Sequence, residues 1–301
     1  MAVIPMLAGP TASGKSAAAL RLAERFGLDI VSADSMQVYV GMDVGTAKPS
    51  AEERARVHHH LVDVVTPAEP FSVADYVRAA EAAIGSVLAE GRSALVTGGT
   101  GFYLRALRFG LPTVPPADPE AQAPLWRLVE AGRLEDLIEE LAAAAPQDAA
   151  RAERNPRRVV RSLEVLRATG KPPSAYPHLP PRYEYDMAVL DPPAEPLAER
   201  IEDRARRMFT AGLMSEVRAL LARYPQQPTA LQGIGYKEVA AHLRGEITEA
   251  EALEAVVVAS RQYAKRQRTW FRREPDARTL HGFGDSLGEV LEVWARAVLA
   301  R

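Results

Sequence analysis

The sequence predicts an α/β fold in which a parallel sheet forms the core, with a helical insertion and a helical C-terminal part. Three observations indicate this fold. Short apolar runs alternate with helical patterns in the first part of the chain, and a glycine-rich loop at Gly9–Ser16 joins the first run to the first helical pattern. Two proline clusters then enclose an alanine- and leucine-rich stretch with helical spacing. These features divide the chain into residues 1–112, the first part of the core, 113–184, the insertion, and 185–301, the rest of the core with the C-terminal helices.

Composition indicates an ordinary soluble protein. Of 301 residues, 47% are hydrophobic and 25% are charged, and the net charge is −2, so any nucleic-acid surface must be local. The absence of cysteine excludes disulfides, a thiolate nucleophile and a cysteine zinc site. The apolar run Val3–Ala8 is too short for a signal peptide, and no apolar stretch reaches membrane-spanning length. We therefore expect a cytoplasmic enzyme or binding protein with no membrane partner.

The loop from Gly9 to Ser16 has the pattern of a phosphate-binding P-loop. It follows a predicted strand, Val3–Ala8, and precedes a helical pattern that ends near Gly27. In such a loop successive N–H groups point at one ligand, and the helix dipole adds positive potential. Lys15 is expected to reach the phosphates, and the Ser16 hydroxyl is expected to bind Mg²⁺. The predicted phosphate-binding residues, in a core of the P-loop NTPase type, are Gly9, Pro10, Thr11, Ala12, Ser13, Gly14, Lys15 and Ser16.

Further short apolar runs predict the remaining strands. They lie at Asp29–Ala33, Leu61–Val65, Ala94–Thr97 and Asp186–Asp191. Pro5 is an awkward residue in the first strand, because it cannot donate a hydrogen bond to a neighbouring strand. Asp34 follows the second strand, and since the carboxyl ends of parallel strands meet at one edge, we expect it to lie beside the P-loop. The glycine-rich segment 98–101 is expected to line the same cleft.

Capping residues mark several helix starts. They are predicted at Ser72–Asp75, Asn155–Pro156 and Thr248–Glu251. From Leu197 onward the pattern is helical throughout. The adjacent histidines at 58–60 point in different directions along a chain, so we interpret them as packing or hydrogen-bonding residues rather than as one metal site.

Basic side chains form stripes on three predicted helices. The stripes are Arg157, Arg158 and Arg161; Arg200, Arg204 and Arg207; and Arg261, Lys265, Arg268 and Arg272. The stretch from Arg261 to Arg273 holds six basic residues and no acidic one. Because unpaired like charges on one helix face repel each other, we expect a polyanion to compensate them, which favours nucleic acid as the partner. Tyr263 and Trp270 lie on the opposite face, where packing is expected.

Taken together, these segments closely resemble the tRNA dimethylallyltransferases of the bacterial type. The matching stretches are Gly9–Ser16, Asp34–Pro49, His59–Asp63, Gly98–Leu104, Asn155–Gly170, Arg200–Met208, Gly233–Glu238 and Gln262–Phe271. The run from Asp34 to Pro49 is the most specific of them. The resemblance implies a P-loop fold whose helical insertion grips the anticodon stem-loop of tRNA. It also implies transfer of a dimethylallyl group from dimethylallyl diphosphate to the exocyclic amine of the adenosine 3′ of the anticodon.

The resemblance also implies roles for individual residues. The P-loop would hold a diphosphate with Mg²⁺ as cofactor, although the loop is otherwise typical of nucleotide and ATP binding. Asp34 would be the base for the amine, and Arg204 and Thr11 would be further catalytic residues that hold the leaving diphosphate. The residues implied to contact tRNA are Asp34, Ser35, Met36, Gln37, Thr100, Gln122, Arg157, Arg158, Arg161, Gln232, Gly233, Gly235, Tyr236, Lys237, Lys265, Arg266, Gln267, Arg268, Trp270 and Arg272. Gln122 departs from the family pattern, in which many relatives carry arginine. The expected state is a monomer.

Three other functions remain open at this point. A P-loop nucleotide or nucleoside kinase that uses ATP explains Gly9–Ser16 and Arg204, but neither the basic C-terminal helix nor the run Asp34–Pro49. A non-catalytic RNA-binding protein leaves Asp34 and Arg204 unexplained. Prenyl transfer to a free adenine nucleotide needs no basic insertion. The main prediction is therefore transfer of a dimethylallyl group to tRNA.

Overall fold

The computed structural model describes residues 2–226 and 232–301, which form two compact units. One unit combines the chain up to Arg108 with Arg182–Arg301, and the other is Phe109–Pro181. The smaller unit begins four residues before the insertion expected at 113–184 and ends three residues before its expected end. It includes both proline clusters, so the proline-rich segments belong to this unit.

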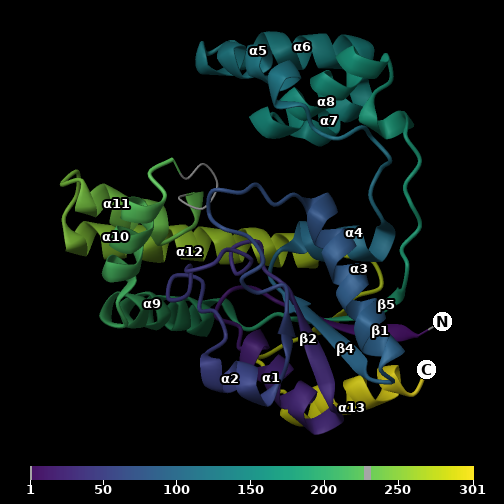
Figure 1. Cartoon of the computed structure of the whole chain (residues 1–301), viewed down its shortest axis with the longest axis vertical. Coiled ribbons are helices and arrows are strands. Elements are labelled where there is room, and N and C mark those ends of the chain that lie inside the picture. The colour runs from purple at the N-terminus through teal and green to yellow at the C-terminus, as the bar shows by residue number, and fades with distance from the viewer. Residues whose placement is uncertain (1, 227–231) are drawn as a thin grey trace. The chain divides into compact units, whose positions relative to one another are not determined.

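The larger unit is built on a six-stranded sheet in which every strand pairs in parallel with its neighbours. The strands are β1 (Val3–Ala8), β2 (Leu28–Ala33), β3 (His59–His60), β4 (Ser93–Gly98), β5 (Glu184–Leu190) and β6 (Arg278–Leu280). Their order is β3-β2-β4-β1-β5-β6, and Figure 1 labels the four central strands β2, β4, β1 and β5. The predicted α/β class with a parallel sheet is confirmed. Because β1 lies between β4 and β5, the loop after β1 sits centrally at the carboxyl edge of the sheet.

Helices cover both faces of this sheet, as a parallel sheet requires. The helices outside the smaller unit are α1 (Lys15–Phe26), α2 (Ala51–Arg56), α3 (Val73–Ala89), α4 (Gly101–Phe109), α9 (Ala194–Thr210), α10 (Leu213–Arg223), α11 (Tyr236–Leu243), α12 (Glu249–Phe271) and α13 (Gly288–Leu299). On one face, α3 and α4 bury Ile84 and Leu104 against alternate residues of β1 and β4. On the other face, α1 and α13 bury Leu22 and Trp294.

Two strand predictions are corrected by the structure. The strand expected at Leu61–Val65 is instead β3, which ends at His60, because Leu61 and Asp63 have left-handed φ values of 62° and 58° that turn the chain. The segment after Leu197 is not helical throughout, since β6 adds an edge strand to β5. Pro5 is accommodated because the pairing of β1 with β4 begins one residue later, at Met6.

The predicted helix caps are confirmed. Ser72 and Thr248 each form a full capping box with the acidic residue three positions on, and the Asn155 side chain accepts hydrogen bonds at the start of its helix. That helix ends at Gly170 and the first helix ends at Gly27, both in the left-handed conformation that suits glycine.

The smaller unit has a hydrophobic core of its own. Its helices are α5 (Pro119–Glu130), α6 (Leu134–Ala144), α7 (Pro146–Ala152) and α8 (Pro156–Thr169), followed by a short 3₁₀ turn at Pro173–Ala175. Leu125, Leu141 and Leu163 are fully buried among these helices. None of the helices within residues 2–226 and 232–301 combines the length and apolar character needed to span a membrane.

Candidate active site

The P-loop leaves β1 and enters α1 as predicted. Gly14 precedes the helix with φ 80°, a left-handed conformation that favours glycine. Gly9 is required for a different reason, because a Cβ there would lie 2.9 Å from the Ser13 hydroxyl and 3.1 Å from the Leu190 side chain. Lys15 is the first residue of α1, and its ammonium lies 3.4 Å from the carbonyl of Pro10. The loop thus closes over the start of the helix, whose dipole adds positive potential.

Two cations and one carboxylate share the space beside this loop. Burial, together with the nearby charge of Arg204, lowers the pKa of Lys15 from 10.5 to about 8, against the opposing effect of Asp34. Burial also lowers the pKa of Arg204, while the charge of Asp34 raises it. Arg204 reaches the site from α9, where its guanidinium donates to the carbonyl of Thr46 at 3.4 Å. The structure therefore brings together three predicted site residues from different parts of the sequence. Because two of them are cations and one is a carboxylate, the group carries a net positive charge.

Asp34 is held in a defined orientation after β2. Its Oδ1 accepts the N–H groups of Met36 at 2.9 Å and Gln37 at 3.4 Å. Its Oδ2 has no hydrogen bond to any residue of the described chain. The next residue is fixed as well, because the N–H of Ser35 donates to the Thr100 hydroxyl at 3.0 Å. One carboxylate oxygen is thus used for local structure and the other is available to a ligand.

Sequence reasoning did not identify the carboxylate that anchors the Asp34–Pro49 run. Glu216, on α10, accepts the N–H groups of residues 43, 44 and 45 at 3.0, 2.7 and 3.2 Å. It also accepts the hydroxyl of Tyr236 at 2.6 Å. Tyr236 is buried, and its ring lies where a Cβ on Gly45 would be. Tyr236 thus supports the loop from inside the protein, and the tRNA contact expected of it stays a prediction.

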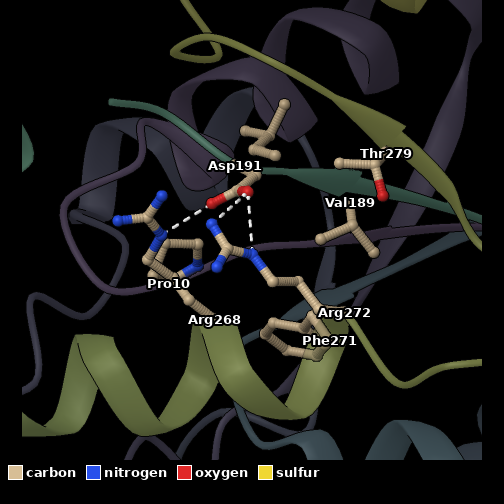
Figure 2. Close-up of a pocket in the computed structure, with 8 residues that line it drawn as sticks. Pro10, Val189, Asp191, Arg268, Phe271, Arg272 and Thr279 are labelled. Carbon is tan, nitrogen blue, oxygen red and sulfur yellow. Dashed lines mark hydrogen bonds and ion pairs between the residues drawn. The ribbon is translucent and has the colours of Figure 1, made fainter. Parts of the chain in front are cut away.

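The basic stripe on α12 differs from its predicted role. Arg268 and Arg272 both form ion pairs with Asp191, at 2.6 and 3.0 Å, and Arg261 pairs with Glu202 at 2.9 Å. Figure 2 shows Asp191 between the two guanidinium groups, close to Pro10 of the P-loop. Burial alone would raise the pKa of Asp191, but the two arginines outweigh it and hold the pKa below its usual range.

These ion pairs correct the expectation that an external polyanion compensates the stripe, because acidic side chains of the same chain do so at these three positions. Lys265 and Arg266 are exposed. Lys265 forms no ion pair with a described residue, whereas the Arg266 guanidinium lies 5.8 Å from the centre of the Tyr263 ring.

Two other residues expected to contact tRNA from α12 are largely enclosed. Gln267 is buried, and its amide bonds to the P-loop and to the carbonyl of Gly99. Trp270 packs so closely on Gly101 that a Cβ there would lie 2.4 Å from the indole. The packing expected of Trp270 is confirmed. The Gln267 side chain is directed into the protein, and the tRNA contact expected of this residue stays a prediction.

The residues expected to contact tRNA at the start of α11 differ in exposure. Gln232 and Lys237 are exposed, and Lys237 lies 3.6 Å from Glu238. Gly233 and Gly235 are buried, and Gly235 has φ 97° at the start of α11. The RNA contacts expected of these residues stay predictions.

The smaller unit presents its predicted RNA-contacting residues on α5 and α8. Arg157 is exposed and forms no ion pair with the described part of the chain. Arg158 pairs with Glu153 at 2.8 Å, and Arg161 pairs with the buried Glu164 at 2.7 Å. Gln122, on α5, donates to the same Glu164 at 2.6 Å. This hydrogen bond gives Gln122 a role within the unit, where the family pattern has arginine.

His59 and His60 take part in hydrogen bonds, and His58 packs edge-on against His60, which agrees with the packing and hydrogen-bonding roles interpreted from the sequence. His60 lies 2.8 Å from the Asp29 carboxylate, which also pairs with Arg92. His58 lies near the same carboxylate, and the ring of His59 bonds to the carbonyl of Val57 at 2.8 Å. Asp29 is in the first half of β2, so this group is away from the carboxyl edge of the sheet that carries the P-loop.

The chemistry of Ser16 fits the predicted magnesium ligand. Ser16 is exposed in the first turn of α1, and its hydroxyl has no hydrogen bond to a described residue. A hydroxyl oxygen is the type of ligand that Mg²⁺ prefers, and Mg²⁺ completes its shell with phosphate oxygens and water.

Comparisons with known proteins give a consistent result. A family model described as IPP transferase matches residues 37–274, and one described as Isopentenyl transferase matches residues 2–65. A tRNA dimethylallyltransferase of Thermus thermophilus is 56% identical over 275 residues, covering 91% of each chain. One of Deinococcus radiodurans is 47% identical over 290 residues, covering 93% of this chain and 95% of the relative. The solved structure of a full-length tRNA isopentenylpyrophosphate transferase from Bacillus halodurans is similar, with a TM-score of 0.74 and 34% identity, covering 100% of this chain and 97% of that one.

Proposed function

The chain belongs to the IPP transferase family, and on that basis we propose that it transfers a dimethylallyl group from dimethylallyl diphosphate to the exocyclic amine of the adenosine 3′ of the anticodon in tRNA. The observation that carries this proposal is the grouping of Lys15, Arg204 and Asp34 beside the P-loop. Two cations at a phosphate-binding loop suit a diphosphate, and a carboxylate next to them suits an amine that must lose a proton. The relatives are named for this transfer and not for a kinase.

The acceptor amine needs a base. Its lone pair is delocalised into the adenine ring, so it attacks weakly unless its proton is taken as the new C–N bond forms. Asp34 meets this need because two backbone N–H groups fix Oδ1 and leave Oδ2 open. We assign the proton of the amine to Asp34 Oδ2. The adenine must leave its stack to reach this carboxylate, a step that costs a few kcal/mol and is easiest in a loop.

The donor needs stabilisation of its leaving group. As the bond between the allylic carbon and the diphosphate oxygen breaks, the electron pair leaves with the diphosphate and the carbon becomes cationic. Lys15, Arg204 and the P-loop N–H groups other than those of Thr11 and Ser13, which are bonded within the protein, stabilise the charge that develops on the leaving oxygen. The Thr11 hydroxyl is a further donor in this role. Formation of the allylic cation thus depends on Lys15 and Arg204, and proton removal depends on Asp34.

Mg²⁺ belongs to this proposal as the cofactor held by Ser16. When bound there, it neutralises part of the diphosphate charge. The exposed cations of the chain, including Arg157 and Lys265, are proposed to contact the phosphates of the anticodon stem-loop. We further propose that the protein acts as a monomer in the cytoplasm.

The proposal is tested by mass spectrometry of an RNA substrate. The protein is incubated with Mg²⁺, dimethylallyl diphosphate and an unmodified anticodon stem-loop that has adenosine 3′ of the anticodon. We expect the RNA to gain the mass of one dimethylallyl group, and a control stem-loop with guanosine at that position to gain nothing.

Parallel reactions contain ATP with a nucleoside, or AMP with the prenyl donor. Phosphoryl transfer from ATP with unchanged RNA would replace the proposal with a kinase. Prenylation of AMP alone would replace it with transfer to a free nucleotide.

A further inference from the structure

Helix α12 directs two polar side chains between the P-loop and the loop that carries Asp34. Gln267 is 5% exposed. Its Oε1 accepts the N–H of Thr11 at 2.8 Å, and its Nε2 donates to the carbonyl of Gly99 at 2.8 Å. Tyr263, one turn earlier on α12, lies next to Thr100 and Gln267. We refer to Tyr263 and Gln267 together as the α12 bridge.

The α12 bridge reaches the base as well as the P-loop. Gln267 donates to the carbonyl of Gly99, and the hydroxyl of the next residue, Thr100, accepts the N–H of Ser35 at 3.0 Å. Ser35 directly follows Asp34. Burial, with the charge of Asp34, raises the pKa of Tyr263 to about 12, so the phenol keeps its proton at physiological pH. Hydrogen bonds of Gln267 and of the adjacent residues Gly99 and Thr100 therefore link Thr11 to the backbone beside Asp34.

The position of the α12 bridge is constrained from two sides. A Cβ on Gly99 would lie 2.4 Å from the Gln267 amide nitrogen, so the glycine allows the two segments to meet. On the next residue of α12, Arg268 is bound to Asp191, which follows β5 (Figure 2). Helix α12 is thus attached to the carboxyl edge of the sheet at the residue that follows Gln267.

We propose that Gln267 is a positioning residue of the transfer reaction, which holds Thr11 at the diphosphate site and keeps the P-loop in register with Asp34. This proposal rests on the proposed function, because it assigns Gln267 to the donor side of that reaction. The N–H of Thr11 is directed to Gln267, and this bond orients the residue whose hydroxyl is proposed to face the leaving group. A buried side chain with both amide groups bonded inside the protein suits this role better than contact with RNA.

The test compares Gln267→Met with Gln262→Met. Methionine has nearly the shape of glutamine without its hydrogen bonds, and Gln262 is an exposed glutamine on the same helix. Hydrogen exchange followed by mass spectrometry is measured first, because it needs no activity. We expect faster exchange of the peptide that contains Thr11 in Gln267→Met and no change in Gln262→Met.

Kinetics and RNA binding then separate the two possible roles of Gln267. Loss of two buried hydrogen bonds is expected to lower kcat/KM for dimethylallyl diphosphate by about tenfold to a hundredfold, while the Kd for the stem-loop stays within about twofold of the wild type. Unchanged donor kinetics with weaker RNA binding would overturn the proposal and make Gln267 an RNA contact. Behaviour equal to that of Gln262→Met in both measurements would also overturn it.

A second variant keeps the test decisive if Gln267→Met does not fold. Tyr263→Phe removes only the hydroxyl that lies beside Gln267 and Thr100. We expect the same direction of change with about a threefold to tenfold effect, and unchanged donor kinetics would contradict the role of the α12 bridge. If the wild-type protein does not prenylate the stem-loop, the proposed function fails, whereas the exchange measurement still decides whether Gln267 holds Thr11.

Discussion

Donor binding should weaken as pH rises through about 8, because Lys15 loses its charge there. Burial and the charge of Arg204 lower the pKa of Lys15 from 10.5 to about 8. About nine tenths of the free enzyme therefore carries the ammonium at pH 7, and about one tenth carries it at pH 9. A bound diphosphate favours the charged form, so binding above pH 8 requires proton uptake. We expect kcat/KM for dimethylallyl diphosphate to fall about tenfold between pH 7 and pH 9.

The assay measures initial rates of prenyl transfer at several donor concentrations between pH 6.5 and 9.5, with the RNA saturating. The Kd of dimethylallyl diphosphate in the absence of RNA, measured by calorimetry over the same range, separates binding from chemistry. The last ionisation of a phosphate monoester lies at about 6, so this donor does not change charge around pH 8. A constant Kd from pH 7 to 9.5 would refute the reasoning that the Lys15 charge holds the leaving group.

Three further predictions follow from the contacts of individual side chains. Arg204→Gln should lower kcat by about 10²–10³ and should move the Lys15 inflection to higher pH, because the Arg204 charge lowers that pKa; an unmoved inflection in the pH–rate profile would contradict this coupling. Glu216→Ala should lower the free energy of unfolding by about 3 kcal/mol in urea titrations, because three loop N–H groups and one phenol lose their acceptor. Lys265→Ala should reduce the slope of log Kd for RNA against log salt concentration by about one. Arg261→Ala should leave this slope unchanged, because the Arg261 side chain is already paired with Glu202.

Local chemistry made much of the fold predictable. The alternation of apolar runs and helical patterns, the P-loop between β1 and α1, and the capping boxes at Ser72 and Thr248 depend on residues close together in the sequence. The carboxyl-edge rule for parallel sheets was enough to place Asp34 beside Lys15. The strand expected at Leu61–Val65 failed because left-handed φ values at two non-glycine residues leave no clear sequence signal.

Contacts between distant segments explain what the sequence could not show. The stretch from Arg261 to Arg273 contains no acidic residue, yet Asp191 and Glu202 pair with three arginines of its stripe. Gln267 and Thr11 are separated by 256 positions, and no periodicity relates them. Their relation depends on where α12 docks against the carboxyl edge of the sheet. In the sequence Gln267 differs from its basic neighbours only as an uncharged polar residue, and Gln262 has the same character.

The most direct measurement is single-turnover prenyl transfer by Asp34→Asn. Asparagine keeps the Oδ1 that accepts the N–H groups of Met36 and Gln37, so the loop should keep its conformation. We expect this variant to bind donor and stem-loop as the wild type does and to transfer the dimethylallyl group at least about a hundredfold more slowly. Transfer within a few-fold of the wild-type rate would contradict the assignment of the amine proton to Asp34.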